Sequence, residues 1–506
     1  MKCLALMAGA TSAVVGLFVS YTAAACAAET AAAPRAKPNL VLIMTDNHGP
    51  WTLGCYGNRD VRTPHIDRLA AEGTLFTHAL SSNAVCSPTR ATFLTGLIPS
   101  QHGVHCFLAG GPPQVGEGSY CTIGEFRSLG EILKDAGYAC GLSGKWHLGA
   151  NMSPQEGFDD LWITKPAGSS AEFYDQEVIE DGRVRKEPQY LTDLWTDRGV
   201  EFISKHRDRP FFLFLAYNGP YGLGKLLLNE ARNRHKDYYA DKLLPSFPRH
   251  EPHAWLFNNR EFINNPVSMR RYAAEISAID DGVGRIMEAL RQAQLDENTL
   301  VVFTADQGLA GGHQGFWGMG DHTRPLTAYD WTMHIPLIFR RPAHVQPGLR
   351  SDALVSNYDF LPTVLAALSV QEASPASRER QRPESIAPTH LQSPGRDFSP
   401  ILRGEPFATT DDDAMFFEFE TVRAVRTRTM KLIRRHPDGP HELYDLQTDP
   451  GETRNLHDVP EYAATREALL ARLEAFFARY ADPQYDLWKA GRSKAPLHWK
   501  RAESPN

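Results

Sequence analysis

The sequence has few cysteines, no excess of basic residues and no long apolar run beyond its first residues. Its 506 residues include only 7 cysteines, and 53 basic against 60 acidic residues give a formal net charge of −7. Nucleic-acid-binding surfaces usually show a basic excess, so nucleic acid is excluded as the expected partner. Heptads, longer repeats and paired cysteines of zinc type are also absent. With 42% hydrophobic and 22% charged residues, the composition is that of a large globular protein, typical of an enzyme.

Residues 1–28 are typical of a secretory signal peptide. A lysine at position 2, an apolar stretch that ends near Val19 and a run of small residues follow the expected order. A membrane anchor is the alternative, but the stretch is barely long enough. Cys26 could instead be a lipid-attachment cysteine, although Ala23 stands where leucine is usual. We therefore expect a periplasmic or secreted protein with no membrane span once the signal is removed.

Five cysteines remain beyond this segment, an odd number. They are Cys55, Cys86, Cys106, Cys121 and Cys140. One interpretation is two disulfides plus one chemically special cysteine, with Cys86 as the special one because of its neighbours. Cys106 and Cys121 bracket a loop rich in glycine and proline and could pair. The alternative is five reduced cysteines that behave as small hydrophobic residues, and the sequence leaves the pairing open.

Short apolar runs alternate with helical patterns over most of the chain. We expect strands at 39–44, 139–142, 211–216, 300–303 and 336–339, and helices after Ser128, where a capping box stands, and over 272–290. Strands that alternate with helices indicate a mainly parallel sheet covered on both faces. Four polar residues follow strands and should meet at one sheet edge, where ligands bind in such folds: Asp46, Lys145, Asn218 and Asp306.

The chain divides into a main domain and a smaller one. We assign residues 37–370 to the α/β domain and 371–406, rich in proline and mixed charges, to a linker or insertion. Residues 407–506 form the second domain, with antiparallel strands over 414–435. A helix then follows, whose apolar face ends at Tyr480. This pattern predicts a smaller α+β subdomain.

The most informative segment runs from Val85 to Pro99. It contains Cys86, Pro88 and Arg90 in the pattern C-x-P-x-R, followed by a helix start and T-G. This extended pattern closely resembles the signature of the formylglycine-dependent sulfatases. The resemblance implies that Cys86 is oxidised to formylglycine by a sulfatase-maturating enzyme.

In the family, the hydrate of formylglycine is the nucleophile. One hydroxyl attacks sulfur, and the other lets the adduct collapse to the aldehyde and release sulfate, whereas a thiolate would leave a stable thiosulfate. Arg90 would steady the hydrate, and the helix N-terminus would add positive potential for an anion.

The resemblance extends over most of the chain. Gly144 to Gly149 matches the family segment G-K-W-H-L-G, Thr304 to Gly308 matches its later metal-binding segment, and Glu442 to Leu446 its C-terminal E-L-Y-D-L. The resemblance implies an alkaline-phosphatase-like sheet domain, one Ca²⁺ and hydrolysis of a sulfate ester, with a sulfated carbohydrate as the expected substrate. The implied metal ligands are Asp46, Asn47, Cys86, Asp306 and Gln307. Lys145 and His147 would bind the sulfate oxygens.

Several positions depart from the family pattern. Asn47 replaces a carboxylate and Gln307 an asparagine, so metal binding should be weaker unless a neighbour such as His48 compensates. Tyr221 stands where a histidine often protonates the leaving group, and Met319 stands where a lysine is expected. For the missing groups we predict His322 as a candidate acid and Arg324 as the replacement sulfate cation.

Two other functions are open alternatives. A phosphate mono- or diesterase of the same superfold would call for more positive charge at the site than these residues supply. A glycan-binding relative without activity would explain Tyr221 and Met319, but it would not be expected to keep Cys86, Arg90 and Lys145.

Overall fold

The structure is a computed structural model, and it describes residues 37–168, 172–371, 391–407 and 413–498. The predicted signal peptide, including Cys26, lies outside the described residues. So does most of the predicted linker. Among the described helices, none has both the length and the apolar character needed to cross a membrane.

A ten-stranded mixed sheet organises the larger part of the chain. In spatial order its strands are β10 (Leu349–Ser356), β2 (Thr74–Leu80), β9 (Leu337–Arg340), β8 (Thr299–Ala305), β1 (Asn39–Asp46), β7 (Phe211–Pro220), β3 (Ala139–Gly144), β4 (Leu161–Thr164), β5 (Gln176–Glu180) and β6 (Arg183–Glu187). Every neighbouring pair from β8 to β4 is parallel, as is β10 with β2, and the other pairs are antiparallel. The expected large, mainly parallel sheet is confirmed.

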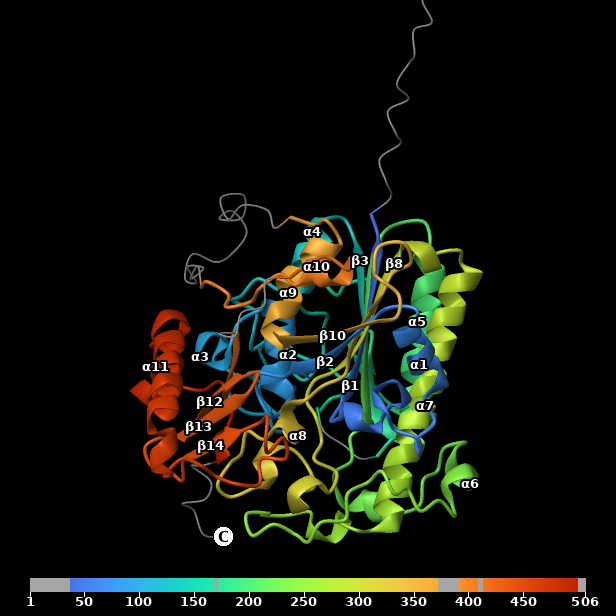
Figure 1. Ribbon diagram of the computed structural model, residues 1–506. Helices are drawn as coiled ribbons and strands as arrows, with labels where there is room; N and C mark the ends of the chain where they lie inside the picture. The colour runs from blue at the N-terminus through green and yellow to red at the C-terminus, as the bar shows by residue number, and fades with distance from the viewer. Residues whose placement is uncertain (1–36, 169–171, 372–390, 408–412, 499–506) are drawn as a thin grey trace, which may run out of the picture. The chain divides into compact units, whose positions relative to one another are not determined.

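Helices cover both faces of this sheet (Figure 1). Val41 and Ile43 of β1 pack on one side, where α5 (Leu191–Lys205), α7 (Pro266–Gln292) and α1 (Pro64–Ala71) lie. Leu40, Leu42 and Met44 face the other side, toward α2 (Cys86–Thr95), α4 (Leu129–Asp135), α9 (Phe360–Ala367) and α10 (Ser399–Leu402). Because both faces are buried, β1 is a continuous apolar run rather than an alternating one.

The shorter helices lie in the connections. They are α3 (Pro99–His102), α6 (Lys236–Tyr239) and α8 (Asp330–Met333). At the start of α4, the Ser128 side chain accepts a hydrogen bond from Glu131 N at 3.3 Å, as the capping box predicts. Strand β7 extends beyond its expected end at residue 216 and continues to Pro220. Asn218 therefore lies inside this strand, and its Oδ1 accepts a hydrogen bond from Trp195 Nε1 at 2.8 Å.

A second, antiparallel sheet follows in the chain. Its strands are β11 (Ala414–Phe419), β12 (Val422–Thr427), β13 (Met430–Arg435) and β14 (Glu442–Asp445). The long helix α11 (Ala463–Tyr480) buries Leu469, Leu473 and Phe477 against Val425 and Leu432 of this sheet. The smaller α+β unit is thus present, as expected. In the predicted linker, the described part includes α10.

The five described cysteines are all free thiols. Cys106 Sγ lies 3.0 Å from His498 Nδ1, and Cys121 Sγ lies 3.5 Å from Glu156 Oε1, so each has a polar partner other than a cysteine. The interpretation with two disulfides is wrong for the described residues. The alternative of reduced cysteines, three of them buried, describes the structure.

Candidate functional site

Three charged side chains converge where the central strands end. Asp46 ends β1, Asp306 directly follows β8, and Lys145 directly follows β3. Parallel strands place their carboxyl ends at the same sheet edge, which brings these residues together from positions 46, 145 and 306. Lys145 Nζ donates a hydrogen bond to Asp46 Oδ2, and all three residues are completely buried.

Cys86 is the first residue of α2, at the same edge. Its Sγ lies 3.5 Å from Asp46 Oδ1 and accepts a hydrogen bond from Gln307 Nε2 at 3.1 Å. The helix begins at Cys86 itself rather than after the motif, so Pro88 falls in the first turn, where a missing N–H leaves no hydrogen bond unmade. The free N–H groups of this turn favour an anion next to Cys86.

Arg90 lies one turn further along α2 and links the parts of the site. Its Nε and Nη2 donate to Asp306 Oδ2 at 3.0 and 2.8 Å, and its Nη1 donates to Lys145 O at 2.7 Å. Nη2 also lies 3.7 Å from Asp46 Oδ2. Arg90 therefore fixes both carboxylates from behind, within a fully buried network.

Asn47 and Gln307 bring amide groups to the two carboxylates. Their backbone N–H groups both donate to Asp306 Oδ1, from Asn47 at 3.2 Å and from Gln307 at 2.9 Å. Asn47 has a φ of 56°, a left-handed conformation that asparagine tolerates better than most residues. The Gln307 side-chain amide contacts Asn47 Oδ1, so the two amides meet beside Cys86.

These residues fit a hard divalent cation. Ligand atoms of Asp46, Cys86 and Asp306 all lie within 4.8 Å of one another. Burial and the charge of Asp306 raise the pKa of Asp46 to about 6, against the opposing effect of Lys145 and Arg90. A cation between the two carboxylates would relieve this repulsion, and two carboxylates with two amide oxygens are a donor set suited to Ca²⁺. Burial also raises the pKa of the Cys86 thiol, which is therefore neutral and a poor nucleophile without modification.

His48 does not strengthen this donor set. It is fully buried, with Nδ1 3.2 Å from Thr45 Oγ1 and Nε2 3.0 Å from Thr52 Oγ1. Both ring nitrogens are therefore engaged by hydroxyl groups, and burial lowers the pKa of His48 to about 3. The suggestion that His48 could serve as a direct metal ligand is wrong in this structure.

His147 lies beside Lys145 on the loop that follows β3. Its Nε2 is 2.9 Å from Leu108 O, while Nδ1 is buried without a hydrogen-bond partner among the described residues. Burial and the nearby Lys145 hold the pKa of His147 well below its usual range. The neutral ring donates to Leu108, so Nδ1 can donate to an anion only when that anion also stabilises the imidazolium form.

Tyr221 is held against the end of β1. Its backbone N donates to Asp46 O at 3.0 Å, and its carbonyl accepts from Asn47 Nδ2 at 2.9 Å. The Lys145 amine lies 5.7 Å from the centre of the Tyr221 ring. The structure therefore places this predicted acid next to the carboxylate and lysine cluster.

His322 and Arg324 lie on the loop after Met319, whose sulfur accepts a hydrogen bond from Gln307 Nε2 at 3.1 Å. His322 Nδ1 lies 2.6 Å from Asp321 Oδ1, a pairing typical of acid–base histidines. Arg324 Nη1 instead donates to the backbone carbonyls of residues 321 and 323, and its guanidinium lies over the Phe257 ring at 4.5 Å. Arg324 makes no hydrogen bond or ion pair with the described residues around Cys86.

Lys165 is a buried lysine near this sheet edge that the sequence patterns did not indicate. It directly follows β4, the strand next to β3, and it is 5% exposed. The signal in the sequence is weak, because β4 is only four residues long and so short a run shows no clear periodicity. The place of Lys165 at this sheet edge is set by the parallel pairing of β3 with β4, which the local sequence does not encode.

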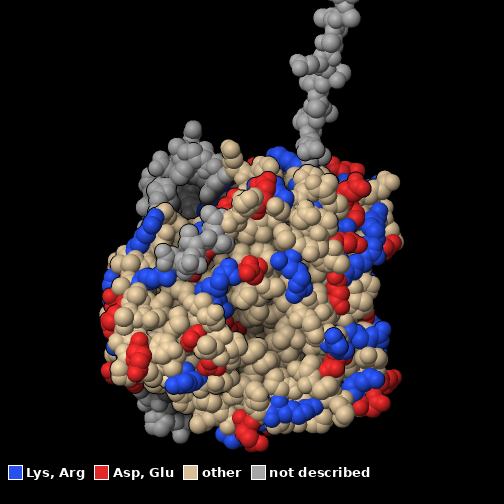
Figure 2. All heavy atoms as spheres, viewed as in Figure 1, with Lys and Arg blue, Asp and Glu red and all other residues tan. Residues whose placement is uncertain are grey.

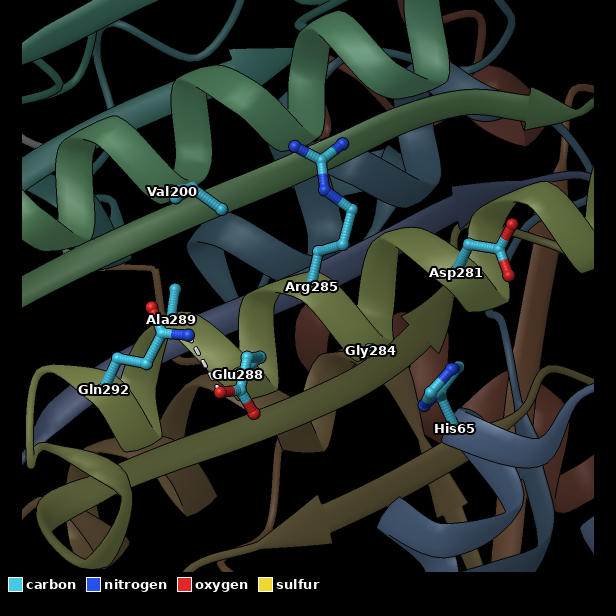
Figure 3. Close-up of a pocket in the computed structure, with 8 residues that line it drawn as sticks. All are labelled: His65, Val200, Asp281, Gly284, Arg285, Glu288, Ala289 and Gln292. Carbon is cyan, nitrogen blue, oxygen red and sulfur yellow. Dashed lines mark hydrogen bonds between the residues drawn. The ribbon is translucent and has the colours of Figure 1, made fainter.

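Charged side chains of both signs are mixed on the surface. Figure 2 shows basic and acidic side chains interspersed over the face in view, with no broad region of one sign there. A groove of about 450 Å³ lies elsewhere, between α5, α7 and the start of α1 (Figure 3). It is lined by Asp281, Arg285 and Glu288 among others, and none of the predicted site residues lines it.

Comparison with known proteins agrees with this geometry. The family model described as Sulfatase matches residues 38–370, about two thirds of the chain. The chain belongs to the sulfatase family. A second model, described as the C-terminal part of N-sulphoglucosamine sulphohydrolase, matches residues 324–479. The protein is thus a sulfuric ester hydrolase by family.

Individual relatives resemble this sulfatase over most of its length. The N-acetylglucosamine-6-O-sulfatase of Bacteroides thetaiotaomicron is 25% identical, over 89% of this chain and 88% of its own. The N-acetylgalactosamine-6-sulfatase of Rattus norvegicus is 31% identical, over 72% of this chain and 67% of its own. The crystal structure of yidJ from Bacteroides fragilis superimposes with a TM-score of 0.72 at 25% identity, over 90% of this chain and 98% of its own.

Proposed function

We propose that this sulfatase removes a sulfate group from a sulfated carbohydrate, with formylglycine formed from Cys86 as nucleophile and one calcium ion as cofactor. The observation that carries the proposal is the position of Cys86, at the free N-terminus of α2 and within the cluster of Asp46, Asp306 and Lys145. The relatives named as sulfatases of 6-sulfated N-acetylhexosamines support the substrate class. We propose such a sugar as the first substrate to test.

Asp46, Asn47, Asp306 and Gln307 would hold the calcium ion, together with the modified Cys86. Calcium would supply positive charge for the sulfate oxygens, and the formylglycine hydrate would supply the attacking hydroxyl. Arg90 keeps Asp306 in place through two hydrogen bonds and lies behind the reacting group. The charges of this buried network are already held by hydrogen bonds, and such preorganisation favours electrostatic stabilisation.

Lys145 and His147 would bind the sulfate oxygens. Lys145 is already charged and fixed by Asp46, and an incoming anion would favour protonation of His147, whose Nδ1 has no hydrogen-bond partner in the part of the chain that the structure describes. The alcohol that leaves needs a proton. His322, oriented by Asp321, is the candidate donor, and Tyr221 is the second candidate because it lies against Asp46.

The protein would be exported before it acts. A signal peptide over residues 1–28 would direct the chain to the periplasm or the outside of the cell, and a sulfatase-maturating enzyme would convert Cys86. Arg324, predicted as a sulfate cation, would reach substrate only through a change in its contacts with the backbone of residues 321 and 323.

Mass spectrometry of the peptide that contains Cys86 tests the nucleophile. Protein from a host that matures sulfatases should show the mass change from CH₂–SH to CHO, and it should release sulfate from N-acetylglucosamine 6-sulfate. The variant Cys86→Ala should fold and release none. An unmodified cysteine in that host, beside a control sulfatase that is converted, would contradict the covalent mechanism.

A further inference from the structure

Lys165 shares the sheet edge with Lys145. Strands β3 and β4 are parallel, with Leu142 opposite Trp162 and Ser143 opposite Ile163. Each lysine follows its strand directly. The two strand ends are tied together by a hydrogen bond from Trp146 N to Thr164 Oγ1 at 3.1 Å. The register therefore brings Lys165 to the side of the site already described.

The loop that carries Lys165 packs directly on His147. Asn151 Nδ2 donates to Lys165 O at 3.0 Å and to Pro166 O at 3.2 Å, which fixes the path of the backbone. At Gly168 the loop meets the His147 ring, and a side chain there would place its Cβ only 1.9 Å from His147 Cδ2. Only glycine allows this approach, so the loop packs directly against the ring that we propose to bind sulfate.

Lys165 is a buried cation with no ion-pair partner among the described residues. The three lysines that are buried in the described part of the chain are Lys145, Lys165 and Lys431. Lys145 pairs with Asp46, and Lys431 lies 2.8 Å from Asp330 and 2.7 Å from Glu452. Within the described part of the chain, the Lys165 amine instead donates a hydrogen bond to Gln176 Oε1, at 3.4 Å.

A buried ammonium group is costly unless an anion or several acceptors compensate it. Burial and the charge of Lys145 lower the pKa of Lys165 to about 8, while Asp46 and Glu172 act in the opposite direction from beyond ion-pair distance. The group is still mostly charged at neutral pH. Its environment therefore favours an anion as a partner for Lys165.

The positive charge of Lys165 matters because Met319 stands where a second lysine is expected. The family pattern has a lysine at that position, but here the thioether accepts a hydrogen bond from Gln307 and carries no charge. We propose that Lys165 binds an oxyanion of the substrate beside Lys145 and supplies positive charge that Met319 does not. The inference rests on the proposed function and deepens it. The oxyanion is either the sulfate that is cleaved or a second anionic group on the same sugar.

Two substitutions test the role of Lys165. Lys165→Met removes the charge at similar length, and Lys165→Arg keeps it, with the exposed Lys205→Met as the matched control. We expect Lys165→Met to raise KM about tenfold or more, the effect of losing one hydrogen bond to a charged group, with a smaller change in kcat. Lys165→Arg should restore most of the loss, which a purely structural role would not produce. Thermal melting identifies a variant that fails to fold.

Two substrates separate the two sources of the oxyanion. 4-Nitrophenyl sulfate carries only the cleaved sulfate, whereas glucosamine 2-N,6-O-disulfate carries a second one. A higher KM with both assigns Lys165 to the cleaved sulfate, and a higher KM with the disulfated sugar alone assigns it to the second group. An unchanged KM with both, for a folded Lys165→Met variant, overturns the proposal.

Calorimetric binding of the disulfated sugar distinguishes this failure from failure of the proposed function. A wild-type protein that binds the sugar but releases no sulfate contradicts the proposed function alone. Weaker binding by Lys165→Met would then still support the role of Lys165, and equal binding would overturn it. A wild-type protein that neither binds nor cleaves the sugar or the aryl sulfate overturns both.

Discussion

Arg90 holds Asp306 by two hydrogen bonds to one oxygen, from Nε at 3.0 Å and from Nη2 at 2.8 Å. Its third contact, from Nη1 to Lys145 O, extends the same side chain to the end of β3. One guanidinium therefore connects the signature helix α2 with the loops after β8 and β3. The donors of a guanidinium lie on three separate nitrogens in a fixed plane, so it can reach both loops at once, whereas the three donors of an ammonium group share one nitrogen.

Replacement of Arg90 by lysine should disable the site while the charge is kept. We expect Arg90→Lys to lower kcat by about 100-fold, because Asp306 and Lys145 lose a common support and the site loses its preorganisation. Sulfate release from an aryl sulfate measures this effect. Arg68→Lys, in an exposed pair with Glu72, is the matched control. A kcat within the error of wild type for Arg90→Lys would show that the pairing with Asp306 is only structural.

Removal of calcium should abolish activity reversibly. With a chelator present, the repulsion between the buried carboxylates of Asp46 and Asp306 is no longer offset by a bound cation, so melting temperature and sulfate release should both fall. Added Ca²⁺ should restore both. We expect Asp306→Asn to bind Ca²⁺ more weakly in a calorimetric titration, because one ligand charge is lost. Full activity after exhaustive chelation would contradict the metal assignment.

The leaving-group acid can be identified by substrates with different leaving groups. A sugar alcohol leaves poorly without a proton, so His322→Ala should lower kcat on a sugar sulfate by about 100-fold or more. Nitrophenolate leaves readily without one, so the same variant should lose much less on 4-nitrophenyl sulfate. Tyr221→Phe is the companion variant. If Tyr221→Phe shows this difference between substrates and His322→Ala does not, the proton comes from the tyrosine.

Glu275 should make stability depend on pH. It is buried on α7 and accepts a hydrogen bond from Tyr190, and burial raises its pKa from 4.5 to about 7. The folded state therefore binds this proton more tightly than the unfolded state, so the stability contributed by the group is present below pH 4.5 and is lost as pH rises toward 7.

The variant Glu275→Gln keeps the shape but cannot titrate. Its melting temperature should change less than that of wild type between pH 5 and pH 7. Melting curves in matched buffers at constant ionic strength measure the difference. Parallel pH profiles for the two proteins would mean that Glu275 keeps its ordinary pKa in the folded state.

Local patterns determined a large part of this protein. The apolar run of β1, the capping box at Ser128 and the helical spacing of α7 depend on neighbours in the chain, and each forms the expected element. The signature around Cys86 likewise pointed to the sulfatase family, because its residues lie within one short segment.

Tertiary structure decided the contacts between distant parts of the chain. Because β7 continues to Pro220, Asn218 lies inside the strand. Thr45 and Thr52 form hydrogen bonds with the two ring nitrogens of His48. The cysteines found partners other than each other. No local pattern encodes such outcomes, because they depend on which side chains the folded backbone brings within a few ångströms.

Lys165 shows this division most clearly. Its sequence context is that of any lysine after a short, mostly apolar run, and it gave no reason to expect a site. The parallel register of β3 and β4 placed it at the same sheet edge as Lys145, and the loop that carries it packs against His147 at Gly168. The sequence by itself determined the chemistry of the nucleophile and its family. Sheet register and burial, which are set by the whole fold, decided which other charges stand around it.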